Sequence, residues 1–250
     1  LSLLCWNIWF DRFAYDVRMS MIMQTIADKR PDLICLQEVL PKFVPVLLQQ
    51  SWAAEYDMSD DGSGSSVAPY GVLIMTKKIL KARYSFYKLP TNMARRLLTA
   101  EIIYNGAIVL VATIHLESLN SQKLREKQLR ICEEIFRKYA TVIFCGDFNF
   151  CSYRNFKILP SYQDVWPTLH PEEKGFTFDS TTNPSIHQFE QMRYDRVMCQ
   201  SLEGLPLSLR SRDENKGFSA LDLQEVFPSD HYGLLTEFAH PSAASESTGR

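Results

Sequence analysis

The residues best suited to chemistry lie in short segments where an apolar run ends. The clearest is 141–149, TVIFCGDFN, whose β-branched apolar run predicts a buried strand ended by Gly146. Asp147 and Asn149 then follow at its carboxyl end, the edge at which open α/β sheets keep their catalytic groups. The same pattern also ends many strands of purely structural role, so the rest of the chain must decide between the two interpretations.

Four other segments leave polar groups near the end of a predicted strand. They contribute Asn7, Glu38, His115 and the pair Asp230 and His231. Hydrolysis of a phosphodiester requires neutralised charge, an activated water and a stabilised leaving oxygen. These residue types suit those three needs, so we expect the segments to converge on one divalent ion and one phosphate at a shared sheet rim.

Each residue has a plausible role and a plainer alternative. Glu38 offers the hard oxygen ligand that Mg²⁺ prefers, although a surface carboxylate after a strand is as common. Asp147 is placed to orient or deprotonate the attacking water, with Asn149 holding that aspartate or the phosphate. His231 suits donation to the developing phosphorane, while a surface histidine beside a capping aspartate explains a bare Ser-Asp-His equally well.

Two further side chains have open assignments. Asp195, in RYDRVM, alternates with apolar residues and is a candidate to orient the His231 ring. A salt bridge from Asp195 to Arg193 or Arg196 is the alternative that the sequence alone favours. His115 taken by itself is more often a structural histidine than a catalytic one.

A set of strands and helices must position these groups. The spacing of apolar residues predicts strands over 1–8 and 32–38 with a helix over 18–29 between them, which is a βα repeat. A longer helix over 121–139 is expected to bury one face. That face consists of Leu124, Gln128, Ile131, Ile135 and Tyr139. The remaining expected elements are short helices over 41–50 and 164–169 and strands over 70–76, 79–89, 97–104, 107–115, 141–149, 176–178, 193–199 and 232–238.

Composition limits the class of protein. A chain of 250 residues that is 46% hydrophobic and 12% aromatic can bury a large core, which excludes collagenous, coiled-coil and disordered classes. We expect one domain over 1–239 and a disordered tail over 240–250, with no apolar run of membrane-spanning length. The formal charge of -2 argues against bulk attraction to long polyanions. Six cysteines without a Cys-x-x-Cys pair favour a reducing, intracellular compartment.

The five segments, in this order, resemble the motifs of the endonuclease/exonuclease/phosphatase superfamily. The motifs are Trp6-Asn7, Leu36-Gln37-Glu38, His115-Leu116-Glu117-Ser118, Gly146-Asp147-Phe148-Asn149 and Ser229-Asp230-His231. The resemblance extends from Leu3 to Phe238 and implies an α/β fold of two packed mixed β-sheets flanked by helices, a four-layer sandwich.

The resemblance also implies roles for the matched residues. Asn7, Glu38 and Asp230 would serve Mg²⁺ and its waters, with Mn²⁺ as a substitute, and Asp147 would act on the nucleophile. The residues that would contact the scissile phosphate are Asn149, His115 and His231, with Ser118 of the His-x-x-Ser motif as a further substrate-binding residue.

Finer motifs resemble those members that cleave the bond between a topoisomerase tyrosine and a DNA 5′ phosphate. They include ICLQEVLP, DVWPTL, GFTFDS and FPSDHYGLL. By this resemblance Tyr70 would line the site at the DNA 5′ end, and Phe176 and Phe178 would form an aromatic platform for the terminal bases. Arg95 or Arg96 would contact a phosphate, unless the two form a solvated basic pair.

The expected function is therefore Mg²⁺-dependent hydrolysis of 5′-phosphotyrosyl DNA by a monomeric catalytic domain, in DNA repair in the nucleus or cytoplasm. The alternatives are a family member acting on RNA, abasic DNA, or inositol or lipid phosphates, and a scaffold that binds DNA ends without turnover. Two departures bear on the substrate. Trp9 stands where the animal enzymes have an acidic residue, and Cys151 stands where they have an arginine.

Overall fold

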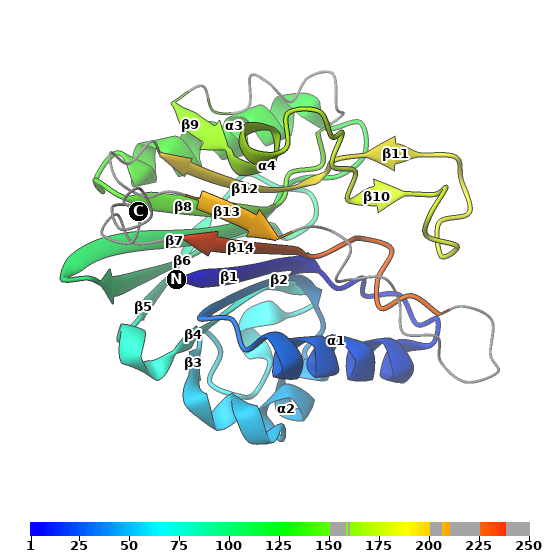
Figure 1. Ribbon diagram of the computed structural model, residues 1–250, viewed down its shortest axis with the longest axis horizontal. Helices are drawn as coiled ribbons and strands as arrows, with labels where there is room; N and C mark the ends of the chain where they lie inside the picture. The colour runs from blue at the N-terminus through cyan, green and yellow to red at the C-terminus, as the bar shows by residue number, and fades with distance from the viewer. Residues whose placement is uncertain (151–158, 160, 201–206, 211–225, 239–250) are drawn as a thin grey trace, which may run out of the picture.

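The computed structural model describes residues 1–150, 159, 161–200, 207–210 and 226–238. The tail expected over 240–250 and Cys151 therefore lie outside the described residues. Within the described part, two six-stranded sheets pack face to face and helices cover their outer faces (Figure 1). No helix in these ranges is both long enough and apolar enough to cross a bilayer.

The first sheet has the strand order β13-β14-β1-β2-β4-β3. Its strands are β1 (Ser2–Asn7), β2 (Leu33–Val39), β3 (Tyr56–Met58), β4 (Gly71–Lys77), β13 (Leu207–Arg210) and β14 (Leu234–Phe238). β1 and β2 are parallel, and all other neighbours in this sheet are antiparallel. The helix α1 (Tyr15–Lys29) makes the connection from β1 to β2 that two parallel neighbours require.

The second sheet has the strand order β5-β6-β7-β8-β12-β9. Its strands are β5 (Arg83–Lys88), β6 (Arg96–Tyr104), β7 (Ala107–His115), β8 (Val142–Asp147), β9 (Tyr162–Asp164) and β12 (Asp195–Gln200). β7 and β8 are parallel and joined by α3 (Gln122–Phe136). A separate hairpin of β10 (Phe178–Asp179) and β11 (Gln191–Met192) lies at the end of the molecule where β1 ends (Figure 1).

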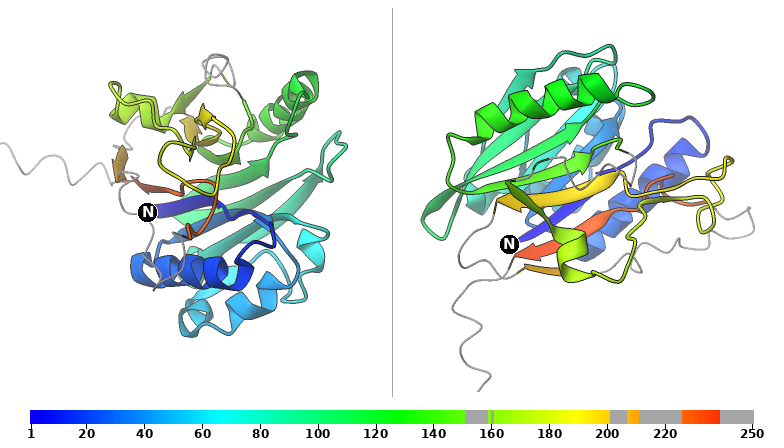
Figure 2. Two further views of the ribbon diagram at one scale, coloured as in Figure 1. Left: turned by 90° about the vertical axis from the view of Figure 1, so that its right-hand side faces the viewer. Right: turned by 90° about the horizontal axis from the view of Figure 1, so that it is seen from above.

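The layers follow the order helix, sheet, sheet, helix, as the resemblance to the superfamily implies. One buried cluster lies between the sheets, a second between the first sheet and α1 with α2 (Phe43–Leu48), and a third between the second sheet and α3. Figure 2 shows α1 and α3 on opposite sides of the paired sheets. The short elements are η1 (Ser51–Glu55), η2 (Ser65–Val67), η3 (Lys78–Leu80) and α4 (Val165–Leu169).

The central strands are apolar on both faces because each face is covered. In β1, Leu3 and Cys5 point between the sheets, whereas Leu4 and Trp6 pack toward α1. Side chains alternate along a strand, so the residue two positions further lies on the same face. A continuous apolar run is the pattern expected of such doubly covered strands.

The face between the two sheets becomes polar at one rim. Each central strand places one polar residue two positions from a residue on that face. These residues are Asn7 after Cys5, Gln37 after Cys35, His115 after Thr113, Asp147 after Cys145, and Asp195 before Val197 in the antiparallel β12. All five side chains are buried. The packing of two sheets therefore brings five sequence-distant polar groups to one place.

The predicted buried face of α3 is confirmed in part. Gln128 is buried, and Ile131, Ile135 and Tyr139 are partly buried and pack against the third cluster. The fully buried face is centred beside the predicted one and also contains Arg125, Leu129, Cys132 and Phe136. The apolar pattern missed this face because it includes Arg125, whose guanidinium donates to the backbone carbonyl groups of Glu117 and Leu119 at 2.8 and 2.9 Å. The strand expected over 79–89 is shorter, because η3 precedes β5.

Candidate active site

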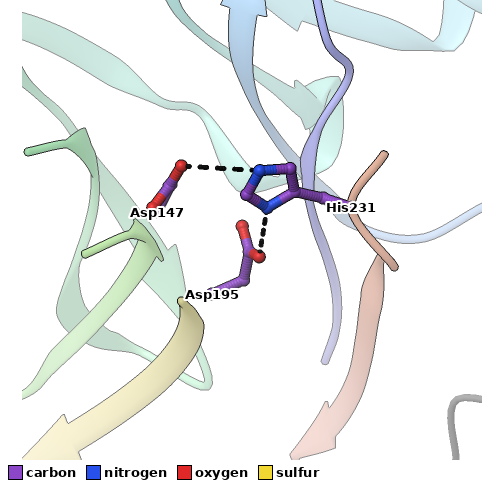
Figure 3. Close-up of side chains that lie close together, drawn as sticks. All are labelled: Asp147, Asp195 and His231. Carbon is purple, nitrogen blue, oxygen red and sulfur yellow. Dashed lines mark hydrogen bonds and ion pairs between the residues drawn. The ribbon is translucent and has the colours of Figure 1, made fainter. Parts of the chain in front are cut away.

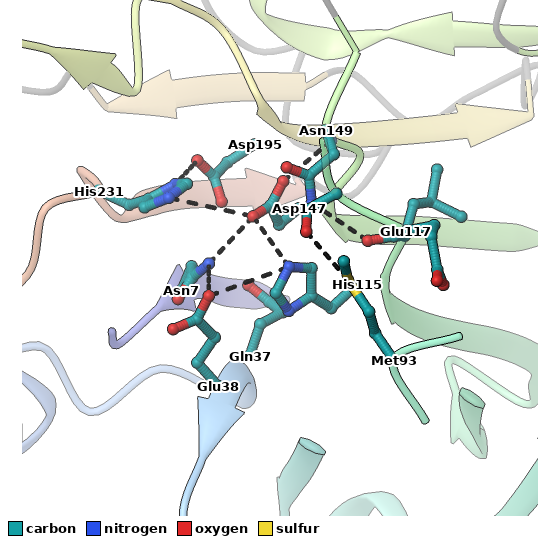
Figure 4. A network of polar contacts seen from close by, with 12 residues as sticks. Asn7, Gln37, Glu38, Met93, His115, Glu117, Asp147, Asn149, Asp195 and His231 are labelled. Carbon is teal, nitrogen blue, oxygen red and sulfur yellow. Dashed lines mark hydrogen bonds and ion pairs between the residues drawn. The ribbon is translucent and has the colours of Figure 1, made fainter. Parts of the chain in front are cut away.

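The side chains of Glu38 and Asp147 meet across the two sheets through Asn7 (Figure 4). The Asn7 Nδ2 group donates to Glu38 Oε1 at 3.2 Å and to Asp147 Oδ2 at 3.0 Å. The two carboxyl groups therefore share one donor, although 109 positions separate them along the chain (147 − 38). This convergence is the arrangement on which the phosphodiesterase hypothesis depends.

The loop after β1 holds two of these side chains through its backbone. The Trp9 amide donates to Asn7 Oδ1 at 3.1 Å, and the Phe10 amide donates to Glu38 Oε2 at 3.0 Å. Trp9 and Glu38 both have positive φ values, 55° and 61°, which cost free energy for residues other than glycine. The loop that carries Trp9 thus supports Asn7 and Glu38 through its backbone.

Arg18 anchors the loop after β1 by hydrogen bonds to backbone carbonyl groups. Its side chain is fully buried, and it donates to the backbone carbonyl groups of Ile8, Trp9, Asp11, Phe13 and Pro228. One guanidinium therefore joins the loop after β1 to the segment that leads into Asp230. Its carbon Cζ also lies 4.4 Å from the centroid of the Trp9 ring, a cation–π contact.

Asp147 is oriented by its own neighbours in the chain. The Asn149 backbone amide donates to Asp147 Oδ1 at 2.9 Å, and Asn149 Nδ2 donates to the carbonyl oxygen of Leu116 at 3.1 Å. Gly146 has φ 139°, and a β-carbon there would lie 2.0 Å from the carbonyl oxygen of Ile114. Only glycine allows β8 to approach β7 this closely.

His231 is held by Asp195, so the candidate pairing is confirmed over the alternative that the sequence alone favoured (Figure 3). Its Nδ1 lies 2.7 Å from Asp195 Oδ2, and its Nε2 lies 4.0 Å from Asp147 Oδ2. The competing salt bridge is wrong, because Arg193 and Arg196 both pair with Asp164. The second sheet thus directs Asp195 toward the reacting side chains.

The charge of His231 follows from these partners. Burial opposes its charged form, but Asp195, Asp230 and Asp147 outweigh burial and raise the pKa of the His231 imidazole well above its ordinary value. At neutral pH the ring is therefore an imidazolium whose Nε2–H faces Asp147. A proton donor is thus placed beside the carboxylate assigned to the nucleophile.

His115 has the opposite electrostatic state. Burial, with smaller effects of Arg95 and His231, lowers the pKa of its imidazole well below the ordinary value. Arg95 Nη1 lies 3.0 Å from His115 Nδ1, and because a guanidinium can only donate, Nδ1 accepts. The proton of the neutral ring is therefore on Nε2, which lies 3.4 Å from Asp147 Oδ2 and 3.9 Å from Glu38 Oε1. His115 also presents a donor to the shared centre.

Burial and neighbouring carboxylates disfavour the charged forms of the carboxyl groups of the site and raise their pKa values. The pKa of Asp147 and that of Asp230 are each raised to about 6, mainly by burial, with the Asp195 charge as a further cause in both. Burial also raises the pKa of Glu38, and Asp147 adds to this shift. Carboxyl groups that raise one another's pKa create a strong negative field. Their all-oxygen donor set fits a hard divalent cation.

A second group of side chains also has the spacing of a metal site. Ligand atoms of Asp147, Asp195 and His231 all lie within 4.8 Å of one another. However, His231 Nδ1 is engaged with Asp195, and an imidazolium has no lone pair left for a metal. In this protonation state His231 is hydrogen-bonded to Asp195 and faces Asp147 at 4.0 Å, and Glu38, Asn7 and Asp230 remain the better cation ligands.

The six residues predicted to bind substrate lie in different surroundings. Arg95 and Tyr70 line the site, since Arg95 contacts His115 and its Cζ lies 5.3 Å from the centroid of the Tyr70 ring. Arg96 turns away, because it donates to the carbonyl oxygen of Ser66 and lies over the Phe86 ring. Arg95 is buried, so the alternative of a solvated basic pair is wrong for it.

The remaining three also differ in position. The Phe178 ring packs at 5.1 Å against the edge of the His231 ring, so it supports that histidine as well as facing outward. Phe176 is half-buried next to Lys174, whose Nζ lies 5.6 Å from the ring centroid. Ser118 Oγ contacts Met93 Sδ at 3.1 Å, beside the loop that leads to Arg95.

Three buried residues to which the sequence pattern gave no role connect the elements around the site by hydrogen bonds. Gln37 Nε2 donates to Thr113 Oγ1 across the two sheets at 2.9 Å. Ser229 Oγ donates to the carbonyl oxygen of Asn7 at 2.6 Å. The Glu117 carboxylate accepts from Thr91 Oγ1 at 2.7 Å and from the Asn92 amide at 2.8 Å. All three residues stand inside the quoted motifs, so their position there was the available signal.

Comparisons with known proteins agree with this geometry. A profile of the Endonuclease/Exonuclease/phosphatase family matches residues 4–231. Tyrosyl-DNA phosphodiesterase 2 of Gallus gallus is 32% identical over 251 residues, which cover 95% of this chain and 66% of that protein. The Homo sapiens protein of the same name is 30% identical over 255 residues, covering 94% of this chain and 67% of that protein. The chain thus spans about two thirds of the length of these curated relatives.

Solved structures of TDP2 proteins also superpose on this chain. A Danio rerio TDP2 structure with a single-stranded DNA product superposes with a TM-score of 0.79 at 27% identity, covering 96% of this chain and 98% of that one. A truncated Caenorhabditis elegans TDP2 superposes with a TM-score of 0.80 at 23% identity, covering 95% and 96%. The human Nocturnin catalytic domain, with a TM-score of 0.68 at 19% identity and coverage of 96% and 93%, shares the fold.

Proposed function

The chain belongs to the Endonuclease/Exonuclease/phosphatase family, and from that membership we propose that it is a metal-dependent phosphodiesterase acting on 5′-phosphotyrosyl DNA. Its relatives named tyrosyl-DNA phosphodiesterase 2 and the DNA-product complex of one of them support this substrate. The product of such a reaction is a DNA 5′ phosphate freed from its tyrosyl peptide.

One observation carries the proposal. Asn7 joins the carboxyl groups of Glu38 and Asp147, and the ring nitrogens Nε2 of His115 and His231 lie 3.4 and 4.0 Å from the same Asp147 oxygen. A base, two hydrogen-bond donors and a cation ligand thus face one place. Hydrolysis of a phosphodiester needs this combination.

Asp147 acts on the attacking water. Asn149 and Asn7 hold its two oxygens, so the carboxylate keeps one orientation when a water approaches. Its pKa of about 6 leaves it ionised at neutral pH and more basic than an exposed aspartate. A carboxylate with these properties orients the water and accepts its proton.

The two histidines stabilise charge on the phosphoryl oxygens. His231 donates from Nε2 as an imidazolium, and Asp195 keeps both the orientation and the charge of the ring. His115 donates from Nε2 as a neutral imidazole, because Arg95 occupies Nδ1. Fixed donors of this kind are among the largest contributions to catalysis of acyl and phosphoryl transfer.

Glu38, Asn7 and Asp230 would hold the metal, for which we propose Mg²⁺ with Mn²⁺ as a substitute. Bound there, the cation would neutralise phosphate charge and stabilise the departing oxygen. Glu38 reaches the site from the end of β2, and Asp230 from the loop before β14. The negative field of these carboxyl groups is the observation that favours a cation.

The proposal extends to the setting of the reaction. Tyr70, Arg95 and Phe178 border the reacting groups and would contact the DNA end. We place the protein inside the cell, in the nucleus or cytoplasm, as a monomeric catalytic domain. The five described cysteines are free and buried, which suits a reducing compartment. Imaging of the full-length protein and its mass in solution test these two points.

A substrate panel tests the function. A 5′-phosphotyrosyl oligonucleotide, an abasic duplex, a poly(A) strand and a phosphoinositide are each offered with Mg²⁺ and with Mn²⁺. We expect a clear preference for the first substrate. Equal or greater activity on another phosphoester would replace the substrate assignment. Inactivity on all four with both metals would favour a scaffold that binds DNA ends without turnover.

A further inference from the structure

An aromatic pair lies at the rim of the site beside Glu38. The Phe10 and Tyr70 rings have centroids 4.7 Å apart and planes inclined by 34°. Phe10 is 41% exposed, so much of its ring faces solvent although it stacks on a neighbour. On Tyr70, the guanidinium carbon of Arg95 lies 5.3 Å from the ring centroid. Arg95, Tyr70 and Phe10 therefore form one continuous stack.

Both ends of this stack are tied to reacting groups. At one end the Phe10 backbone amide donates to Glu38 Oε2 at 3.0 Å. At the other end Arg95 donates to His115 Nδ1 at 3.0 Å. The Phe10 backbone thus bonds directly to Glu38, the carboxylate proposed to bind the cation. The exposed Phe10 ring therefore stays close to that carboxylate. The hydrogen bond to Glu38 comes from the Phe10 backbone, so a substitution of the side chain by alanine, leucine or tyrosine keeps it.

The direction of the reaction indicates what this ring would meet. Attacking and leaving oxygens lie roughly in line in phosphoryl transfer. In the proposed function Asp147 acts on the attacking water, and Asn7 stands between Asp147 and Glu38. On that assignment the leaving oxygen would depart on the Glu38 side. Phe10 lies on that side, so the group attached to the leaving oxygen passes the aromatic pair.

We propose that Phe10, supported by Tyr70, contacts the ring of an aromatic leaving group and makes the enzyme selective for phenolic over alkyl esters of a DNA 5′ phosphate. This inference rests on the proposed function and names a specificity-determining residue for it. Stacking on an aromatic ring is strong enough to produce a selectivity of about tenfold.

The test compares two leaving groups on one DNA strand. An oligonucleotide with a 5′-phosphotyrosyl group and the same oligonucleotide with a 5′-phospho-aminohexyl group are hydrolysed by the parent and by Phe10→Ala. We expect kcat/KM to fall about tenfold on the tyrosyl substrate and less than about twofold on the alkyl substrate. The alanine variant keeps the backbone hydrogen bond to Glu38, and Phe10→Tyr should restore the parent's preference.

Phe13→Ala is the matched control. Phe13 is 52% exposed on the same loop, and its ring lies 6.4 Å from that of Trp9. We expect this variant to leave both substrates unchanged. If Phe10→Ala fails to fold, as thermal unfolding would reveal, Phe10→Leu keeps the apolar volume without the aromatic face and takes its place.

The outcomes separate the inference from the function. Equal losses on both substrates, in a parent that cleaves phosphotyrosyl DNA, would overturn the role of Phe10 and leave the function intact. Equal losses that disappear on a strand with an abasic 5′ nucleotide would assign Phe10 to the terminal base instead. A parent with no activity on the tyrosyl substrate would overturn both proposals.

Discussion

Replacing Asp147 by asparagine should lower activity and at the same time stabilise the metal-free protein. The activity falls because an amide cannot accept the proton of the attacking water, a contribution of about 10²–10⁴ in rate. The stability rises because the buried carboxylate is held in a place that disfavours its charge. A purely structural aspartate would show neither effect.

The magnitude follows from the shift in pKa. Burial and the Asp195 charge raise the pKa of Asp147 from 3.8 to about 6, so the folded state binds the proton more tightly than the unfolded chain does. Stability is then lost as pH rises through this interval, by about 3 kcal/mol in total. Asparagine avoids this loss, but its single amide oxygen replaces two carboxylate oxygens, one bonded to the Asn149 amide and the other to Asn7 and facing His115 and His231. The lost hydrogen bonding costs about 1 kcal/mol. The net gain at pH 7.5 is about 2 kcal/mol.

Urea unfolding in the presence of a chelator measures this gain. At pH 7.5 we expect Asp147→Asn to be more stable than the parent by about 2 kcal/mol, and at pH 4.5 the difference should be close to zero. Asp32→Asn is the control of opposite sign. Burial disfavours the Asp32 carboxylate, but Lys77 and Ser2 outweigh burial and lower its pKa. Its replacement should reduce stability at pH 7.5, with full activity retained.

Three results would contradict the role given to Asp147. A stability difference between Asp147→Asn and the parent that is the same at both pH values would mean that the carboxylate is not held at a raised pKa. Turnover of the variant within a few-fold of the parent would mean that Asp147 does not act on the attacking water. Loss of activity together with loss of stability at pH 7.5 would reduce the residue to a structural support.

Three other substitutions test the supporting structure. Asp195→Asn should lower the pKa of His231 and move the alkaline limb of the pH–kcat profile to lower pH; an unmoved limb would contradict the pairing. Gly146→Ala should cost at least about 3 kcal/mol in urea unfolding, against about 1 kcal/mol for Gly106→Ala, where nothing lies within 4 Å of the new β-carbon. Arg18→Met should weaken Mn²⁺ binding measured by calorimetry, because the loop after β1 loses its anchor; unchanged affinity would limit Arg18 to stability.

Much of this protein could be predicted from its sequence because the relevant signals are local. Apolar runs on doubly covered strands identify the central strands, and the bounds of β7 agree with the prediction at both ends. The strand ends also identify Asn7, Glu38 and Asp147 as candidates, since a polar residue directly after a buried run must emerge at a rim. The order of five motifs identifies the family.

Other features depend on contacts that no local pattern specifies. Asp195 pairs with His231 and not with the neighbouring arginines, because Asp164 of another strand forms salt bridges with both Arg193 and Arg196. The burial of Arg125 on the inner face of α3 follows from carbonyl groups in the preceding loop.

The electrostatic states were likewise decided only by the tertiary structure. His115 and His231 are both histidines beside the same aspartate, yet one is neutral and the other charged. Arg95 approaches the first and Asp195 the second, and these partners come from different strands or loops. Sequence therefore determined which groups can meet at the rim, through the alternation of side chains along each strand. The packing of the two sheets determined which proton each group holds, because a pKa depends on burial and on charges that are distant in the chain.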